Sequence, residues 1–371
     1  MEHPENDSAY LGLNVNKGIE QPPSINPYLK RKKRQQYTSG EFVEGILKGD
    51  ISMLGQAVTL VESLLPEHQQ IAQEVIEKCL PYAGNSIRLG ITGVPGAGKS
   101  TFIEALGMHV IRQNKKLAVL AIDPSSERSK GSILGDKTRM EELSGAANAF
   151  IRPSPSAGSL GGVARKTRES IVLCEAAGFE TVFVETVGVG QSETAVHSMV
   201  DFFLLIQVTG TGDELQGIKR GIMEMADGIA INKADGSNIE KANVAKVQFQ
   251  NALRLFPASD SGWKPRVETC SSLHNIDIDN VWEMVTEYVT FTKNNSFFSY
   301  KRNNQSKYWM YESINEYLRD HFYQNKFIQK ALEEKEEQVL NNKISSFIAA
   351  KELLDLYFEK FVTRDNRDNV T

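Results

Sequence analysis

The 371-residue sequence predicts an α/β protein built on a mainly parallel, doubly wound sheet. Between residue 86 and about residue 291, short apolar runs alternate with longer stretches of helical periodicity. Strands that alternate with helices form a mainly parallel sheet with helices on both faces. Such sheets bind ligands at the carboxyl ends of their strands, so polar motifs at those ends are candidates for function.

Six apolar runs are predicted to be strands, with helical patterns between them. The runs are IRLGIT, LAVLAID, TVFVET, DFFLLIQVT, DGIAINKAD and RVETC, in chain order. The helical patterns are TFIEALGMHVIRQ, GGVARKTRESIVLCEAAG, IKRGIMEMA and IEKANVAKVQFQNALRLF. The runs have the length of strands, and apolar residues in the patterns recur every three or four positions, as on one face of a helix.

The chain before this alternating segment has a different composition. Residues 1–38 are rich in Asn, Pro, Ser and Lys, which is typical of a loosely ordered tail. Their basic run from Lys30 to Arg34 is interpreted as solvated charge, with a nuclear address or a patch for an acidic partner as the alternative. The next residues have helical spacing with breaks at Gly49 and Pro66, which predicts two or three helices.

The C-terminal part is predicted to be helical. From about residue 304, charged and apolar residues are interleaved at helical spacing. The apolar positions need a surface to bury against, either the α/β domain or a second copy of the chain. They include Trp309, Tyr317, Phe322, Phe347, Leu354 and Phe358. The predicted organisation is a tail (1–38), an N-terminal helical segment (39–85), the α/β domain (86–295) and a C-terminal helical segment (296–371).

Composition and charge narrow the function classes. A net charge of −5 argues against nucleic acid as the main partner, which usually requires a strongly basic face. Cys79, Cys174 and Cys270 are far apart and form no CxxC pair, so neither a disulfide framework nor a thiolate metal site is predicted. No apolar run reaches the length of a membrane span, and the polar N-terminus resembles no targeting peptide. We therefore expect a cytoplasmic protein without a membrane partner.

The segment GVPGAGKS matches the phosphate-binding pattern G-x-x-x-x-G-K-[ST] at every defined position. A predicted strand precedes it and a predicted helix follows, as in P-loop NTPases. Its glycines let the backbone approach a phosphate, and the helix adds its positive N-terminal end. Lys99 is placed to reach the β- and γ-phosphates, and Ser100 to bind Mg²⁺. The predicted phosphate-binding residues are Gly93, Val94, Pro95, Gly96, Ala97, Gly98, Lys99, Ser100 and Thr101.

A second motif indicates guanine rather than adenine. The stretch AINKADG contains the N-K-x-D pattern, formed by Asn232, Lys233 and Asp235, at the end of a predicted strand. Asp235 can accept two hydrogen bonds from guanine, whereas adenine offers no matching pair of donors and would leave the carboxylate unpaired. The aliphatic part of Lys233 can cover the base, and Asn232 would connect this loop to the P-loop.

The next predicted strand ends in TCSSLHN. Ser271, Ser272 and Leu273 are placed to complete the base pocket with backbone N–H groups.

Acidic residues at other strand ends suggest a magnesium and water shell. TVFVETVGVG places Glu185 at a strand end and Gly188 shortly after it, the positions of a D-x-x-G element with Glu in place of Asp. Glu185 would hold Mg²⁺ directly or through water, and the N–H of Gly188 can approach the γ-phosphate. Asp123 and Asp136 are further candidates for the metal or attacking-water shell, with turn or capping roles as the alternative.

No glutamine follows Gly188 directly, as it does in Ras-type GTPases, because Val189 stands there and the first glutamine is Gln191. No arginine finger within the chain can be assigned. We therefore expect slow intrinsic hydrolysis that a partner accelerates.

Taken together, these stretches resemble the MeaB/ArgK type of methylmalonyl-CoA mutase-associated GTPases, whose human relative underlies a cobalamin disorder. The resemblance covers roughly residues 40–360. It is carried by LVESLLPEH, GVPGAGKSTFIEALG, AIDPSS, GSILGDKTRM, FIRPSPSAGSLGGVARKTRE, VFVETVGVGQSE, GTGDELQGIKRGIMEMADGIAINKADG and the C-terminal helices. The stretch SSLHNIDID departs from the family's equivalent loop, because it lacks the glycines often found there.

The resemblance implies a GTPase of the signal-recognition, MinD and BioD-like branch that acts on GTP with Mg²⁺ and releases GDP. It implies a homodimer, built partly through the C-terminal helices, that binds an adenosylcobalamin-dependent acyl-CoA mutase, gates delivery of its cofactor and protects it. The mutase would in turn stimulate hydrolysis. The resemblance places Asp123, Asp136 and Glu185 around the metal and the γ-phosphate.

The loop GTGDELQGIKRG matches a mobile switch of the family that signals to the mutase. The switch residues implied are Asp213, Glu214, Gln216 and Lys219, with Lys219 near the nucleotide or the second subunit. A flexible surface turn is the alternative.

Other functions compete with this one. A nickel-inserting GTPase of the same branch would carry Cys/His metal motifs, whereas the six histidines here are scattered. A kinase linked to amino-acid transport would need an acceptor pocket and a base for the acceptor hydroxyl, for which the sequence offers no separate candidates. A nucleotide-sensing scaffold without turnover is a further alternative.

Overall fold

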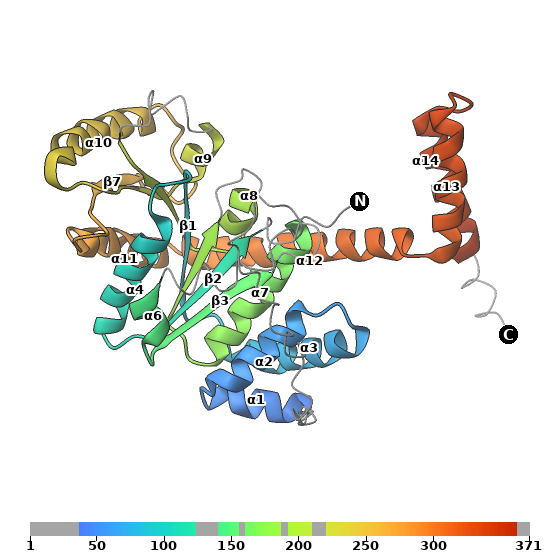
Figure 1. Cartoon of the computed structure of the whole chain (residues 1–371), viewed down its shortest axis with the longest axis horizontal. Coiled ribbons are helices and arrows are strands. Elements are labelled where there is room, and N and C mark those ends of the chain that lie inside the picture. The colour runs from blue at the N-terminus through green and yellow to red at the C-terminus, as the bar shows by residue number, and fades with distance from the viewer. Residues whose placement is uncertain (1–36, 124–139, 156–159, 187–191, 210–219, 362–371) are drawn as a thin grey trace, which may run out of the picture. The chain divides into compact units, whose positions relative to one another are not determined.

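The structure is a computed structural model that describes residues 37–123, 140–155, 160–186, 192–209 and 220–361 (Figure 1). All elements named below belong to the structural unit that begins at Thr38.

A seven-stranded, entirely parallel sheet forms the centre of the fold. Its strands are β1 (Ile87–Gly93), β2 (Leu117–Asp123), β3 (Ala149–Pro155), β4 (Thr181–Thr186), β5 (Phe202–Gln207), β6 (Gly228–Ile231) and β7 (Arg266–Thr269). They lie in the order β3-β2-β4-β1-β5-β6-β7, and every neighbouring pair is parallel. The P-loop strand β1 is central, so the carboxyl ends of β4, β1, β5 and β6 lie side by side at one edge of the sheet.

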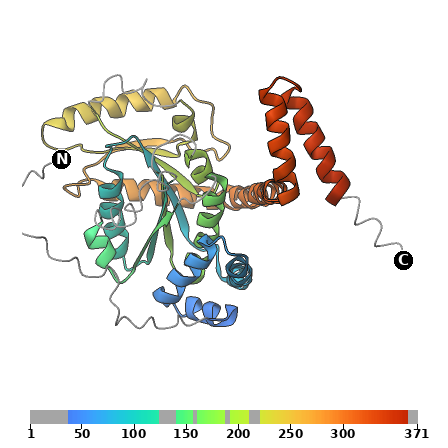
Figure 2. The same cartoon turned by 45° about the vertical axis from the view of Figure 1, so that its right-hand side comes forward.

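Helices cover both faces of the sheet (Figures 1 and 2). On one face, α4 (Lys99–Arg112) contacts α6 (Glu141–Gly145) and α11 (Ile278–Asn294). On the other face lie α7 (Leu160–Ala176), α8 (Ser192–His197), α9 (Arg220–Met225) and α10 (Ile239–Leu253).

The apolar strand runs explain this arrangement. Every residue of β4 and of β5 is buried. In β5, Leu204 and Ile206 belong to the core that contains α4 and α11, whereas Leu205 belongs to the core with α9 and α10. Alternate side chains of a strand point to opposite faces, so a continuous apolar run is stable only where both faces are covered.

All six predicted runs are strands, whereas the seventh strand, β3, was not predicted. This strand reads AFIRPSP, and its two prolines lack the N–H that a sheet ladder uses. It stands at the edge of the sheet, where β2 is its one pairing partner among the described strands. Proline is tolerated there because one side of an edge strand needs no partner, which is also why the run is hard to identify as a strand.

The N-terminal helical segment consists of α1 (Ser39–Leu47), α2 (Ile51–Glu62), α3 (Pro66–Cys79) and the 3₁₀ turn Leu80–Tyr82. Thr38 and Glu41 form a capping box at the start of α1, and the Asp50 carboxylate accepts hydrogen bonds from the first turn of α2. Gly49 links these helices with a φ of 76°. Helices α2 and α3 pack against α7.

The C-terminal segment consists of α12 (Phe297–Tyr323), α13 (Lys326–Leu340) and α14 (Ser346–Phe361), of which the last two lie side by side (Figures 1 and 2). Trp309 of α12 is buried, and its indole N–H donates to Ser198 O at 3.1 Å. By contrast, Tyr317 is 72% exposed and Phe347 is 85% exposed. The apolar residues of this segment thus divide between those buried within the chain and those left uncovered.

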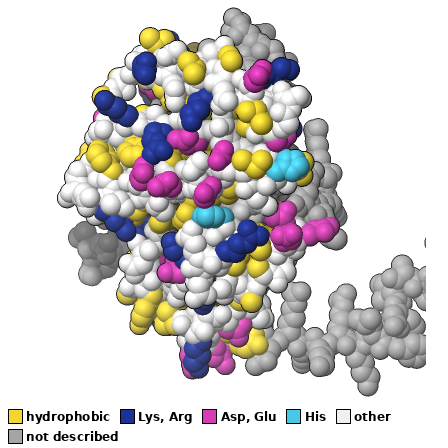
Figure 3. Space-filling model, turned by 90° about the vertical axis from the view of Figure 1, so that its left-hand side faces the viewer, with side chains coloured by type: hydrophobic (Ala, Val, Ile, Leu, Met, Phe, Trp, Pro, Cys, Tyr) yellow, Lys and Arg dark blue, Asp and Glu magenta, His cyan; other side chains and the backbone are white. Residues whose placement is uncertain are grey.

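On the face drawn in Figure 3, which is the left-hand side of Figure 1, the described Lys and Arg side chains are interspersed with Asp and Glu. None of the described helices combines the length and the apolar character that crossing a bilayer requires.

An ion-pair network ties α12 to the amino ends of the central strands. Arg302 donates to both carboxylate oxygens of Asp201 at 2.7 Å and to the carbonyl of Ser86, also at 2.7 Å. The Asp201 side chain is 2% exposed and also accepts from the Arg88 N–H of β1 at 2.8 Å. This arrangement fixes α12 relative to the strand that carries the P-loop.

We predict that Arg302→Ala lowers the free energy of unfolding by about 3 kcal/mol, because it leaves the buried Asp201 carboxylate without its cation. Denaturant titration followed by circular dichroism measures this change. In the control Lys48→Ala, which breaks the exposed Lys48–Glu44 pair, the loss should stay below about 0.5 kcal/mol. Equal stability losses in the two variants would contradict the assignment.

Candidate functional site

The P-loop connects β1 to α4 at the carboxyl edge of the sheet. Gly93 ends β1, and Gly98 caps α4 in the left-handed conformation, with φ of 83°. In the loop, Ala97 is fully buried, whereas Pro95, Gly96 and Thr101 are exposed. The predicted phosphate-binding residues thus form one turn that leads directly into the first turn of a helix, the arrangement that binds phosphate in P-loop proteins.

Two of the glycines are required by close contacts. A Cβ on Gly93 would lie 2.4 Å from the carbonyl oxygen of Ile206 in the neighbouring strand β5. A Cβ on Gly98 would lie 3.0 Å from Nδ2 of Asn232, in addition to the strain of its positive φ. The motif therefore holds the loop tightly against the neighbouring strand and against the second motif.

Lys99 folds back onto the loop that precedes it. Its ammonium group donates to Gly93 O at 2.9 Å and to Val94 O at 3.4 Å. Burial lowers the pKa of Lys99, while the carboxylates of Glu185 and Glu193 act in the opposite direction. A partly desolvated cation in this position is stabilised by any anion that enters the loop.

The N-K-x-D loop is attached to the P-loop by two hydrogen bonds. Asn232 Nδ2 donates to Ala97 O at 2.9 Å, which is the connection that the sequence analysis expected of Asn232. Lys233, which has a φ of 61°, donates to Gly96 O at 2.9 Å. The base-binding motif and the phosphate-binding motif are therefore one connected unit, although 135 residues separate Asn232 from Ala97.

The loop after β7 completes this unit. The Ser272 N–H and hydroxyl both donate to Asn232 Oδ1, at 3.1 and 2.7 Å, and the Ser271 hydroxyl donates to the half-buried carboxylate of Asp235. The Ser271 N–H donates to Ile276 O at 3.0 Å. The backbone N–H groups of both serines, expected to face the base, are thus engaged inside the loop, and their hydroxyls position the N-K-x-D residues instead.

Leu273, the third residue predicted for the base pocket, is 73% exposed. Its side chain is therefore open to solvent beside the N-K-x-D loop.

Residues suited to a magnesium ion lie at the same edge of the sheet. Glu185 is the buried penultimate residue of β4 and is in register with Ile91 of β1. Ser100 is the second residue of α4. Thr186 donates to the Thr92 hydroxyl at 2.8 Å, which fixes β4 against β1 next to the P-loop. Asp123 ends β2, two strands away from β1.

The donor chemistry fits Mg²⁺ bound together with a nucleotide. Among the described residues, no three His, Cys, Asp or Glu side chains are grouped to hold a metal ion by themselves. Mg²⁺ in nucleotide sites typically takes one or two protein oxygens and completes its shell with phosphates and water, which Ser100 and Glu185 can support.

Three buried polar atoms at this edge also lack a hydrogen-bond partner within the described structure. They are Ser192 Oγ, Glu193 Oε2 and Gln207 Nε2. Buried polar groups of native proteins are normally satisfied, so these atoms indicate a place for a bound polar group or water. The sequence analysis did not single them out. Glu193 lies within the stretch VFVETVGVGQSE. The sequence signal for its burial is its position about one helical turn before the apolar Val196, which places both on one side of a helix.

Several predicted residues lie outside the described residues. They are Asp136, Gly188 and the switch residues Asp213, Glu214, Gln216 and Lys219. For Asp123, the description covers its place in β2 and not its side chain.

The sequence matches a known protein family. Residues 54–327 match the family model described as "Methylmalonyl Co-A mutase-associated GTPase MeaB". The chain belongs to the MeaB family. The structure joins the two motifs that a family of GTPases requires, the P-loop and N-K-x-D, and supports the match from the geometry of the site.

Individual relatives of the MeaB family agree. "GTPase ArgK" of Escherichia coli (strain K12) is 45% identical over 316 residues, which cover 85% of this chain and 96% of the relative. "Methylmalonic aciduria type A homolog, mitochondrial" of Mus musculus is 42% identical over 323 residues, which cover 84% and 78%. A crystal structure described as "LAO/AO transport system kinase" is 38% identical, with a TM-score of 0.69, and covers 88% of this chain and 99% of that one.

Asp235→Asn tests the base specificity of this site. We predict that the variant loses about 3 kcal/mol of GDP affinity, roughly 100-fold, because two charge-assisted hydrogen bonds to guanine are replaced by an amide that mismatches one donor. Xanthosine diphosphate, which carries a carbonyl in place of the guanine amino group, should regain affinity. Equilibrium titration with both nucleotides measures the exchange. The exposed Asp260→Asn is the control, and unchanged GDP affinity in Asp235→Asn would contradict the assignment.

Proposed function

We propose that this MeaB-family chain binds GTP together with Mg²⁺, hydrolyses it to GDP and phosphate, and acts as a chaperone and gatekeeper of an adenosylcobalamin-dependent acyl-CoA mutase. The observation that carries the nucleotide part is the pair of hydrogen bonds from Asn232 and Lys233 to the P-loop. They hold a guanine-specific loop at a fixed position relative to a phosphate-binding loop. The mutase part is supported by the description of the family.

The proposed reaction is in-line attack of water on the γ-phosphate. The P-loop backbone and the N-terminus of α4 hold the phosphates, and Lys99 turns from the carbonyls of Gly93 and Val94 to the β- and γ-oxygens. Ser100 and Glu185 would hold Mg²⁺, which supplies positive charge for the developing negative charge. A bond forms between the water oxygen and phosphorus, the bond to the β–γ bridging oxygen breaks, and the water protons remain on phosphate and solvent.

Coupling to the mutase follows from the position of the site. We propose that loss of the γ-phosphate relaxes the loops that surround it and thereby changes the interaction with the mutase. The switch residues Asp213, Glu214, Gln216 and Lys219 and the γ-phosphate contacts Asp136 and Gly188 are proposals that rest on the sequence.

The name of the related crystal structure favours one alternative, a kinase. A kinase would transfer the γ-phosphate to an acceptor, whereas the proposed GTPase releases inorganic phosphate. Measuring the release of inorganic phosphate separates the two, because only the GTPase produces free phosphate.

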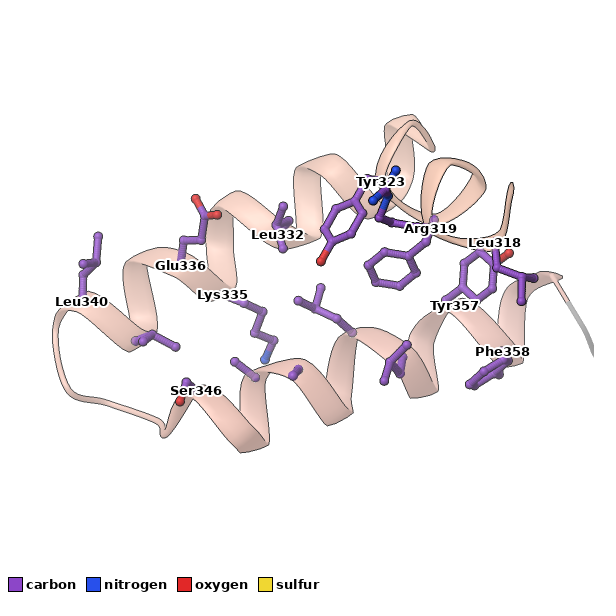
Figure 4. Close-up of a pocket in the computed structure, with 16 residues that line it drawn as sticks. Leu318, Arg319, Tyr323, Leu332, Lys335, Glu336, Leu340, Ser346, Tyr357 and Phe358 are labelled. Carbon is purple, nitrogen blue, oxygen red and sulfur yellow. The ribbon is translucent and has the colours of Figure 1, made fainter. Parts of the chain in front are cut away.

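We also propose that the protein works as a homodimer through its C-terminal segment. The last turns of α12 together with α13 and α14 enclose an apolar groove of about 740 Å³, into which Leu332, Tyr323 and Tyr357 point (Figure 4). Leu340, which lines the groove, is 81% exposed, and Phe347 in the first turn of α14 is 85% exposed. Apolar patches of this kind are rare on monomers and typical of subunit interfaces.

The proposed compartment is reducing, as the cytoplasm is. Cys79, Cys174 and Cys270 are all free thiols buried in the fold.

Lys99→Ala is predicted to reduce GTP turnover at least about 100-fold, since it removes the charge that stabilises the transferring phosphoryl group. Release of inorganic phosphate is measured with and without purified methylmalonyl-CoA mutase and adenosylcobalamin. The native chain should turn over faster when the mutase is present, and the exposed control Lys264→Ala should behave like the native chain. If the mutase does not change the turnover of the native chain, the proposed partner is wrong. If Lys99→Ala turns over GTP at the native rate, the proposed role of Lys99 is wrong.

Light scattering after size exclusion tests the dimer. We predict a mass of twice the 41.3 kDa of one chain for the native protein. The variants Leu340→Glu and Phe347→Glu should shift it towards the monomer, because a charge would be buried in the interface. Lys241→Glu on the exposed surface of α10 should leave the mass unchanged. A native mass of one chain at every concentration would exclude the proposed dimer.

A further inference from the structure

The short helix α8 lies directly against the P-loop strand. Val196 of α8 and Val200 just after it are so close to Gly90 of β1 that an added Cβ would come within 2.9 Å of both. Since α8 connects the end of β4 to the start of β5, it runs from the carboxyl edge of the sheet towards the amino edge. Glu193 precedes Val196 by nearly one helical turn, so it lies on the same side and nearer to Gly93, next to the start of the P-loop.

Glu193 is buried there without full compensation. The residue is 1% exposed, and Oε2 has no hydrogen-bond partner in the described part of the chain. A buried carboxylate oxygen that lacks a partner among the described residues costs stability, so its presence at the carboxyl edge of the sheet indicates a functional reason.

The charges around Lys99 provide that reason. The carboxylates that act on its ammonium group are Glu185 and Glu193. One positive and two negative side chains therefore interact at the phosphate-binding loop. The backbone N–H groups and the start of α4 attract phosphate, whereas the second carboxylate repels it through a low-dielectric region. A divalent cation on the nucleotide weakens this repulsion, because it cancels part of the negative charge of the phosphates.

We propose that Glu193 is a specificity-determining residue of the nucleotide site: its buried negative charge makes the phosphate cradle accept a nucleotide only together with its divalent cation. Glu193 acts through its charge and is distinct from the assigned metal ligands Ser100 and Glu185. The inference rests on the proposed GTPase function and adds a selection step to it, by which free nucleotide is rejected and the metal-bound form is retained.

The test compares nucleotide binding with and without metal in the full chain. GDP and a non-hydrolysable GTP analogue are titrated at constant ionic strength, once with Mg²⁺ and once with EDTA, into the native protein and Glu193→Gln. Matched controls are Glu193→Asp, which keeps the charge, and Glu224→Gln, which removes an exposed charge on α9. Thermal unfolding verifies that each variant folds, and Glu193→Met, also uncharged and of similar length, replaces the Gln variant if that one is unstable.

We expect removal of Mg²⁺ to weaken binding to the native chain by a large factor. In Glu193→Gln this factor should be roughly tenfold smaller, because affinity for metal-free nucleotide rises while affinity for the Mg²⁺ form changes less than about threefold. Both controls should keep the native factor. A general packing defect would weaken binding in both conditions, so a gain in metal-free affinity is specific to the proposed role.

Two results would overturn the inference while leaving the GTPase proposal intact. One is that removal of Mg²⁺ weakens nucleotide binding to Glu193→Gln by the same factor as in the native chain. The other is a selective loss of Mg²⁺-dependent binding, which would make Glu193 a metal ligand. If the native chain binds neither GDP nor the GTP analogue in either condition, the proposed function itself fails, and this inference fails with it.

Discussion

The contact between the P-loop and its neighbours is the constraint on which the rest of the site depends. Gly93 approaches the carbonyl of Ile206 so closely that no side chain fits, and Asn232 holds Ala97 from the adjacent loop. These contacts exist because β1, β5 and β6 are parallel neighbours whose carboxyl ends meet at one edge. The sheet topology thereby turns two distant sequence motifs into one binding unit.

Charge is the second organising feature. The ammonium group of Lys99 donates to a carbonyl of its own loop. The negative charges of Glu185 and Glu193 also act on it. A metal-bound nucleotide would bring anionic oxygens that accept hydrogen bonds from the lysine and the backbone N–H groups, together with a cation that carboxylates attract. This charge distribution is the basis of the proposal that the site selects a metal-bound nucleotide over a bare anion.

Much of this was accessible from the sequence, for physical reasons that differ between elements. The strands could be predicted where both faces are buried, as in TVFVET, because burial on both faces requires a continuous apolar run. The edge strand β3 was not predicted, because an edge strand tolerates proline and its sequence therefore does not read as a strand. The connection from Asn232 to the P-loop was predictable, because the spacing of the motifs and their places at strand ends imply it.

Other features depend on tertiary contacts that no local pattern contains. Trp309 was placed among residues awaiting a partner surface, and only the packing of α12 on the loop after α8 shows that this chain buries it. The engagement of the Ser271 and Ser272 N–H groups depends on the conformation of one irregular loop. The role proposed for Glu193 depends on its burial and on the effect of its charge on Lys99, and no local sequence pattern contains either.

The central claim is that one connected unit recognises guanine and phosphate together. Calorimetric titration of the full chain with non-hydrolysable GTP and ATP analogues in Mg²⁺ tests it most directly. The account predicts saturable binding of the GTP analogue, with the ATP analogue weaker by roughly 100-fold or more, because Asp235 finds no matching donors on adenine. Equal or tighter binding of the ATP analogue would contradict it.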